Sequence, residues 1–269
     1  MKSDDSSLQS AADAAAEAIE DATAQAADTI DRAIDEATGV PTDDGDIEES
    51  THDGSTLIAE RRGDHAASTT VVLVHGIGMG RKVFADLSRR LEPEALVVSA
   101  DLPGYGEAPE PPRTPAIERM ADLVAAYVRH LGRGPVILLG HSMGTQVVTE
   151  VTVRHPGTVS HLVLVAPTVD RHHRHALTQL VRLGRDLFGE SAKVLLLGGR
   201  EYLRAGPHLR RKMHAMLVHR PEHAYPRLEV PTLVVRGELD VVVPQPWFDG
   251  VVAAIPDAAP FVVEGHHHE

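Results

Sequence analysis

The sequence predicts an α/β fold in which a mostly parallel β-sheet is covered by helices. Short apolar runs rich in β-branched residues alternate with stretches of helical periodicity along most of the chain. These runs are apolar at consecutive positions, which is typical of parallel strands that are buried on both faces. The chain has 269 residues, of which 42% are hydrophobic, so it can bury a substantial core.

The expected elements follow one another in chain order. Strands are expected at 56–60, 70–76, 95–100, 135–140, 161–166, 231–237 and 259–265. Helices are expected between them at 83–91, 114–132, 145–155 and 244–255. Residues 171–228 break the alternation, and we expect two or three helices there that form a cap on the sheet. This segment is rich in Lys, Arg and His, which favours a solvated face, or else attraction of an anionic substrate or of the chain's own acidic N-terminal segment.

Residues 1–54 differ in composition from the rest of the chain. They are rich in Ala and hold 16 acidic against 2 basic residues, whereas the remainder holds 23 acidic and 24 basic residues. Because few large aliphatic residues are present, we expect a fraying helix followed by a disordered linker. The globular domain is then expected to span 55–269, and its near-neutral balance gives no indication of nucleic-acid binding.

Composition also limits the chemistry and the compartment. The chain has no cysteine, which excludes disulfides, thiolate catalysis and Cys-ligated metals. No run of 18 apolar residues is present, so we expect no membrane span. The first residues, MKSDDSSLQS, are polar and lack the apolar core of a secretory signal. A cytoplasmic protein is therefore expected.

The sequence Gly140-His141-Ser142-Met143-Gly144 lies between an expected buried strand and an expected helix. A serine on such a sharp turn adopts a strained backbone conformation, and side chains two residues to either side would collide. Glycine at both flanking positions avoids that collision. The hydroxyl would then lie at the carboxyl edge of the sheet, near helix amides that stabilise negative charge.

This motif, together with three others, resembles the α/β-hydrolase-fold superfamily of serine hydrolases. His75-Gly76 resembles the family's oxyanion turn, DLPGYGEAP (101–109) its D-x-P-G-x-G loop, and GELDVVVP (237–244) the loop that carries its acid. The closing segment resembles the family's last strand and catalytic-histidine loop. The resemblance implies a cofactor-free triad and two oxyanion amides: Ser142, Asp240 and His268, with the N–H groups of Ile77 and Met143 and with Gly78 as the alternative to Ile77.

Several alternatives remain for the site. The terminal His266, His267 and His268 could belong to a tag or a metal site, but consecutive side chains diverge, so we expect a base and no metal. Asp170, after the strand at 161–166, is the second candidate for the acid. Residues expected beside the substrate are His75, Gly76, Gly78 and His141.

The resemblance also implies a helix after the catalytic histidine, where this sequence has only Glu269. We therefore expect either a shortened chain or a less covered sheet. The predicted function is hydrolysis of a small ester or related acyl compound through a covalent acyl-enzyme. The alternatives are a C–C bond hydrolase or an acyltransferase with the same triad, or a non-catalytic binding protein with this fold. The sequence does not indicate the oligomeric state.

Overall fold

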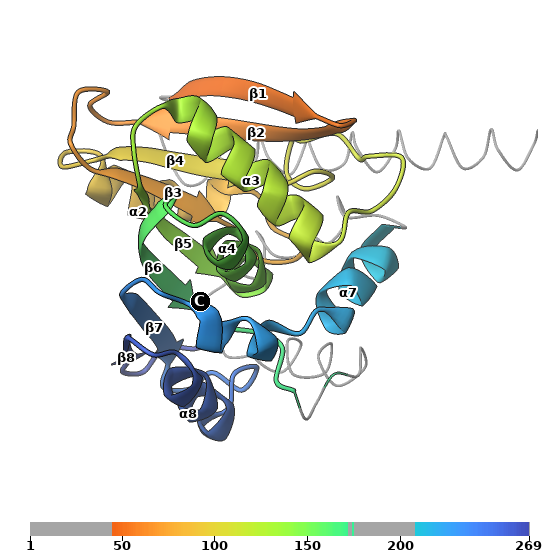
Figure 1. The fold of residues 1–269 in the computed structure, drawn as a ribbon, viewed down its shortest axis with the longest axis vertical. Helices are drawn as coiled ribbons and strands as arrows, with labels where there is room; N and C mark the ends of the chain where they lie inside the picture. Colours follow the sequence, from red (N-terminus) through yellow and green to blue (C-terminus); the bar gives the residue numbers. More distant parts are fainter. Residues whose placement is uncertain (1–44, 172–173, 175–207, 269) are drawn as a thin grey trace, which may run out of the picture.

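The computed structural model describes residues 45–171, 174 and 208–268. These residues form an eight-stranded sheet and the helices that pack on it, which confirms the predicted fold class (Figure 1). The strands are β1 (Asp46–His52), β2 (Ser55–Arg62), β3 (Thr70–Val74), β4 (Leu96–Asp101), β5 (Val136–His141), β6 (Val159–Val165), β7 (Thr232–Gly237) and β8 (Ala258–Val263). The helices are η1 (Arg81–Phe84), α2 (Ala85–Leu91), α3 (Ile117–Leu131), α4 (Met143–Arg154), α7 (Leu209–Val218), η3 (Pro221–His223), η4 (Tyr225–Arg227) and α8 (Gln245–Ala254).

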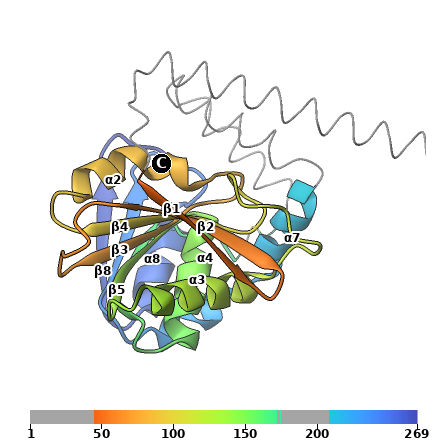
Figure 2. The same ribbon diagram turned by 90° about the horizontal axis from the view of Figure 1, so that it is seen from above.

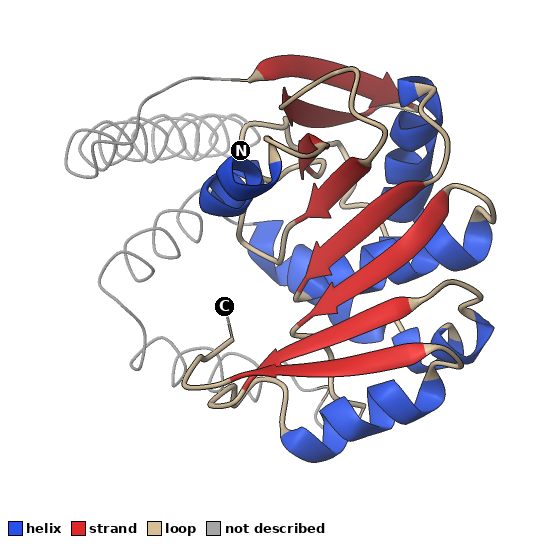
Figure 3. Cartoon of the chain, turned by 90° about the vertical axis from the view of Figure 1, so that its left-hand side faces the viewer, coloured by secondary structure: helices blue, strands red, loops and turns tan. Residues whose placement is uncertain are grey.

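The strand order across the sheet is β1-β2-β4-β3-β5-β6-β7-β8. Strands β3 to β8 pair in parallel, whereas β2 is antiparallel to both β1 and β4. Figure 3 shows these strands fanned across the molecule with helices on either side. Because the strands from β3 onward are parallel, their carboxyl ends share one edge, where loops can bring distant side chains together.

The expectation of a disordered linker up to residue 54 is wrong for its last part. Asp46–His52 form β1, which pairs with β2 through a hairpin at Asp53-Gly54. Both turn residues have positive φ, 48° and 73°, the conformation that Asp-Gly favours in tight hairpins. The acidic composition concealed the strand because β1 lies at the sheet edge, where charged side chains remain in solvent. Residues 1–44 lie outside the described residues.

Helices cover the two faces of the sheet unequally. Helices α3, α4 and α8 pack on one face, and the larger hydrophobic core lies beneath them (Figures 1 and 2). Figure 2 shows α2 on the opposite face, where a smaller core cluster forms against β3 and β4. On this second face Leu233 of β7 is 37% exposed and Phe261 of β8 is 57% exposed. The sheet is thus less covered at its β7–β8 end.

Of the expected cap at 171–228, residues 171, 174 and 208–228 are described, and 172–173 and 175–207 lie outside the described residues. In the described part, α7 packs against α4, where the Gln146 side-chain amide donates to the Met216 carbonyl at 3.1 Å. Lys212 is buried, with its ammonium 2.6 Å from Glu110 and 4.5 Å from the centre of the Tyr105 ring. This segment therefore contacts both α4 and the loop after β4.

Candidate active site

Ser142 occupies the sharp turn between β5 and α4. Its backbone has φ 51° and ψ −119°, a strained conformation for a residue other than glycine. A Cβ on Gly144 would collide with the Val74 carbonyl oxygen, and one on Gly140 would lie 2.5 Å from the Gly144 carbonyl oxygen. Gly140 therefore allows β5 and α4 to approach closely at the turn, and Gly144 allows the start of α4 to lie against the end of β3, as the motif predicts.

Asp240 lies just after β7 and is buried, with an exposed fraction of 2%. Its Oδ1 accepts hydrogen bonds from the amides of Val242 and Val243 at 2.7 and 2.9 Å, and its Oδ2 lies 2.9 Å from His268 Nδ1. Burial alone would raise the pKa of Asp240, but His268 and the two amides together hold that pKa below its ordinary value. The carboxylate is therefore ionised near neutral pH.

His268 lies between the acid and the serine. Its Nδ1 faces Asp240, and its Nε2 is 3.1 Å from Ser142 Oγ. The imidazole is buried, with 4% of it exposed. An imidazole that donates from Nδ1 to a carboxylate keeps Nε2 free to accept the serine proton. The structure thus brings together the three side chains that were singled out as nucleophile, acid and base.

The segment that carries His268 is anchored to the end of β7 by hydrogen bonds that the sequence did not predict. The amide of Glu238 donates to Val263 at 2.9 Å, and that of Leu239 donates to His266 at 2.8 Å. The Glu238 carboxylate also accepts the amide of Gly265 at 2.9 Å. The sequence signal for this contact is the Gly237-Glu238 pair at the start of the acid loop, because the glycine permits the close approach of the last loop.

His141 provides a second anchor for the same segment. Its Nε2 donates to the His268 carbonyl oxygen at 3.0 Å, and the two rings are 5.4 Å apart. Burial, together with the neighbouring His268, lowers the pKa of His141 to about 4. His141 is therefore neutral at physiological pH, and its hydrogen bond holds the main chain of the candidate base in place.

The burial of His141 predicts that the unfolding free energy of the protein depends on pH. The pKa of His141 falls from 6.5 in the unfolded chain to about 4 on folding. Protonation therefore favours the unfolded chain, and the stability contributed by neutral His141 is lost as pH falls from 6.5 toward 4. In His141→Gln, which keeps a donor for the His268 carbonyl, we expect the drop in unfolding free energy between pH 7 and pH 5 to shrink by about 2 kcal/mol.

Urea unfolding at the two pH values measures this difference. The exposed His161 is the matched control, and His161→Gln should retain the full dependence on pH. An unchanged pH slope in His141→Gln would show that His141 is not held neutral by the fold.

The candidate oxyanion turn after β3 lies against the serine. A Cβ on Gly76 would come within 3.0 Å of Ser142 Cβ, so the turn and the nucleophile elbow are in close contact. Met143 is the first residue of α4, and the first amides of a helix have no acceptor within the helix. Ile77 is partly buried against the main core. Gly78 has φ 69° and open space around its Cα, consistent with a tight turn.

His75 supports this turn from within the protein. It is fully buried; its Nδ1 lies 2.7 Å from the Gly76 carbonyl oxygen, and its Nε2 accepts the amide of Leu102 at 3.1 Å. Both ring nitrogens are therefore engaged by backbone, and burial lowers the pKa of His75. These contacts tie the candidate oxyanion turn to the loop after β4.

The other candidates lie elsewhere. Asp170, the alternative acid, lines a separate pocket with Trp247, while Asp240 makes the hydrogen bond to His268. His266 is exposed, and its Nδ1 lies 2.8 Å from the Glu264 carbonyl oxygen. Within the described residues, no three His, Asp or Glu side chains cluster as metal ligands. None of the described helices is both long and apolar enough to cross a membrane.

Comparison with known proteins supports the assignment of the fold family. A family model described as alpha/beta hydrolase fold matches residues 69–191. The chain is 40% identical over 107 residues to pimeloyl-[acyl-carrier protein] methyl ester esterase from Neisseria meningitidis, covering 40% of this chain and 33% of the relative. It is 30% identical over 111 residues to (E)-2-((N-methylformamido)methylene)succinate hydrolase from Acinetobacter baylyi, covering 40% and 42%. These matches therefore span between a third and about two fifths of the relatives' length.

Solved structures resemble a larger part of the chain. A thermophilic esterase from Thermogutta terrifontis superposes with a TM-score of 0.70 at 23% identity, covering 83% of this chain and 92% of the esterase. E-2-(acetamidomethylene)succinate hydrolase superposes with a TM-score of 0.67 at 21% identity, with coverage of 83% and 92%. Together with the sheet topology and the matched family model, these similarities show that the chain has the α/β-hydrolase fold.

Proposed function

We infer that the protein is a serine hydrolase that cleaves small carboxylic esters through a covalent acyl-enzyme. The observation that carries this proposal is the position of His268, whose two ring nitrogens lie 2.9 Å from Asp240 and 3.1 Å from Ser142. A serine hydroxyl is a weak nucleophile at neutral pH unless an adjacent base accepts its proton and a third group orients that base. His268 is positioned to serve as that base, and Asp240 as the group that orients it.

In the proposed reaction, Ser142 Oγ attacks the ester carbonyl carbon while His268 Nε2 takes the hydroxyl proton. The negative charge passes to the carbonyl oxygen, which the amides of Ile77 and Met143 stabilise, with Gly78 as the alternative to Ile77. One such donor typically contributes about 2.7–4 kcal/mol to transition-state stabilisation. His268 then returns the proton to the leaving alkoxide, and the same base activates a water that releases the acid and regenerates Ser142.

The choice of substrate class follows from the relatives. Similar sequences include a pimeloyl-[acyl-carrier protein] methyl ester esterase and an (E)-2-((N-methylformamido)methylene)succinate hydrolase, whose names describe hydrolytic enzymes. A compact ester is compatible with a buried nucleophile, since Ser142 is only 7% exposed. No cofactor enters the proposed mechanism, because base, acid and oxyanion donors all come from the chain.

A fluorophosphonate probe tests the proposal, since it reacts with an activated serine but not with an ordinary one. We expect stoichiometric labelling at Ser142, detected by intact mass and peptide mapping, and no labelling of Ser142→Ala. Ser88 is a second buried serine, 2% exposed and hydrogen-bonded to Ser99, so Ser88→Ala serves as the matched control and should retain labelling.

Hydrolysis of p-nitrophenyl acetate and butyrate should disappear together with labelling in Ser142→Ala. A folded wild-type protein that neither labels nor turns over esters would contradict the proposal and support a non-catalytic binding protein. Labelling without ester turnover would leave the nucleophile in place and contradict the substrate class.

A further inference from the structure

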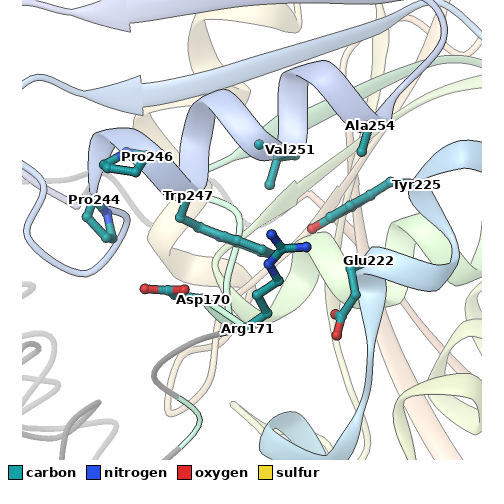
Figure 4. A pocket seen from close by; sticks show the side chains of 10 residues that line it. Asp170, Arg171, Glu222, Tyr225, Pro244, Pro246, Trp247, Val251 and Ala254 are labelled. Carbon is teal, nitrogen blue, oxygen red and sulfur yellow. The ribbon is translucent and has the colours of Figure 1, made fainter.

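A pocket separate from the Ser142 site lies between α8, the η3–η4 segment and the loop after β6 (Figure 4). Its volume is about 420 Å³, which is within the range of small-molecule sites. Neither Ser142 nor His268 lines it. The lining residues are Asp170, Arg171, Glu222, Tyr225, Pro244, Pro246, Trp247, Gly250, Val251 and Ala254.

Tyr225 places an unpaired polar group in this pocket. Its side chain is 1% exposed, and its hydroxyl has no hydrogen-bond partner among the described residues. Figure 4 shows the hydroxyl directed inward, toward the side chain of Arg171. Burial, with a contribution from Glu222, raises the pKa of Tyr225, so the group stays protonated and can donate. A buried hydroxyl without a partner is unfavourable by about 1–3 kcal/mol, which a ligand oxygen would relieve.

The wall formed by α8 is apolar. Trp247, Val251 and Ala254 face the pocket from successive turns of the helix (Figure 4). The Trp247 indole N–H already donates to the Pro167 carbonyl oxygen at 2.8 Å, so the ring offers an apolar surface to a ligand. A Cβ built on Gly250 meets no atom within 4 Å, which confirms open space beside the helix.

The charges around the pocket have mixed signs. Asp170 and Glu222 line it together with Arg171, and Glu222 also accepts a hydrogen bond from Arg174 at 2.5 Å. The two carboxylates disfavour an anionic ligand, and the Arg171 guanidinium, with the Arg174 guanidinium bound to Glu222 beside the pocket, disfavours a cationic one. This combination selects a neutral polar group.

We propose that this pocket is a binding site for a small neutral amphiphile, whose ring or short chain packs on Trp247, Val251 and Ala254 and whose oxygen accepts a hydrogen bond from Tyr225. Suitable oxygens are those of an ether, ketone, amide or alcohol. The site is independent of the proposed hydrolysis, because the ligand does not contact the serine or its base.

The chain contains a single tryptophan, and it lines the pocket, so its fluorescence reports occupancy directly. Methoxycyclohexane is a suitable probe, since its ether oxygen only accepts hydrogen bonds and serine hydrolases do not cleave it. We expect a saturable change in Trp247 emission with wild-type protein. The same change is expected after Ser142 has been blocked with a fluorophosphonate, because the two sites are separate.

Three variants test the contacts. Tyr225→Phe should bind the probe about 2- to 12-fold more weakly, the effect of one hydrogen bond, while the ligand-free protein is at least as stable as wild type. Gly250→Leu fills the open space and should abolish the emission change. Tyr127→Phe is the matched control, since Tyr127 is also buried but its hydroxyl lies 3.1 Å from Glu48. It should leave probe binding unchanged and lower stability.

Circular dichroism establishes that each variant is folded. The proposal is overturned if wild type shows no saturable change up to the solubility limit of the probe. It is also overturned if folded Tyr225→Phe and Gly250→Leu bind the probe as tightly as wild type does. Binding that disappears on blocking Ser142 would place the probe in the proposed catalytic site and would equally refute a separate pocket.

Discussion

Replacement of Asp240 by asparagine is expected to lower kcat for p-nitrophenyl esters by about 10⁴-fold without unfolding the protein. Asparagine can keep its carbonyl oxygen toward the amides of Val242 and Val243, so the loop is preserved. Its amide group then faces His268 Nδ1 as a donor, which forces the ring proton onto Nε2. In that tautomer the imidazole can no longer accept the proton of Ser142.

The measurement is kcat and KM for wild type, Asp240→Asn, Asp249→Asn and Asp170→Asn. Asp249 lies on the exposed side of α8, where its carboxylate accepts from Gln245 at 2.7 Å, so its variant should retain wild-type kcat. Asp170→Asn should do the same, because the hydrogen bond to His268 comes from Asp240. A loss of kcat that occurred only in Asp170→Asn would show that the acid lies in the loop after β6.

Replacement of Gly237 by alanine is expected to lower kcat by about 10²-fold or more, while the core remains folded. A Cβ at this position would collide with the main-chain carbonyl oxygens of His266 and His267. These atoms are backbone and cannot rotate away, so the segment must shift as a whole. A displacement of about 1 Å in the candidate base would break its alignment with Ser142.

Gly250→Ala is the matched control for this prediction. Gly250 lies on α8, close to the same end of the sheet, but a Cβ there meets nothing within 4 Å. It should therefore retain full kcat and gain slightly in helix stability. Thermal unfolding and ester turnover measured together separate a displaced base from a general loss of folding. Unchanged turnover in Gly237→Ala would mean that the terminal loop tolerates the shift and that the position of His268 is not precisely set.

The elements that the sequence predicted well are those whose local pattern of apolar and glycine residues matches their burial and packing in the fold. The parallel strands are apolar at consecutive positions because both of their faces are covered, and the runs at 70–74 and 96–100 are fully buried. The turn at Ser142 was predictable because strain and close packing require glycine at fixed spacing. In contrast, β1 was missed because an edge strand carries charged side chains and has no buried face to reveal it.

The contacts around the candidate site could not be predicted from local sequence patterns. No local pattern shows that Glu238 accepts the amide of Gly265 or that His141 donates to the His268 carbonyl. These bonds join residues 27 and 127 positions apart in the chain. Likewise, the sequence singled out His75 as a neighbour of the substrate, whereas the fold uses both of its ring nitrogens to hold the candidate oxyanion turn to the loop after β4.

The sequence by itself determined the α/β class, the strained serine turn and the order in which nucleophile, acid and base occur along the chain. It could do so because steric limits on the backbone and the burial of strands act over a few residues and leave a local pattern. Only the tertiary structure decided which histidine faces the serine, which aspartate orients it and that the Tyr225 hydroxyl has no hydrogen-bond partner within the described part of the chain. Those outcomes depend on distances between segments that meet only when the sheet has formed.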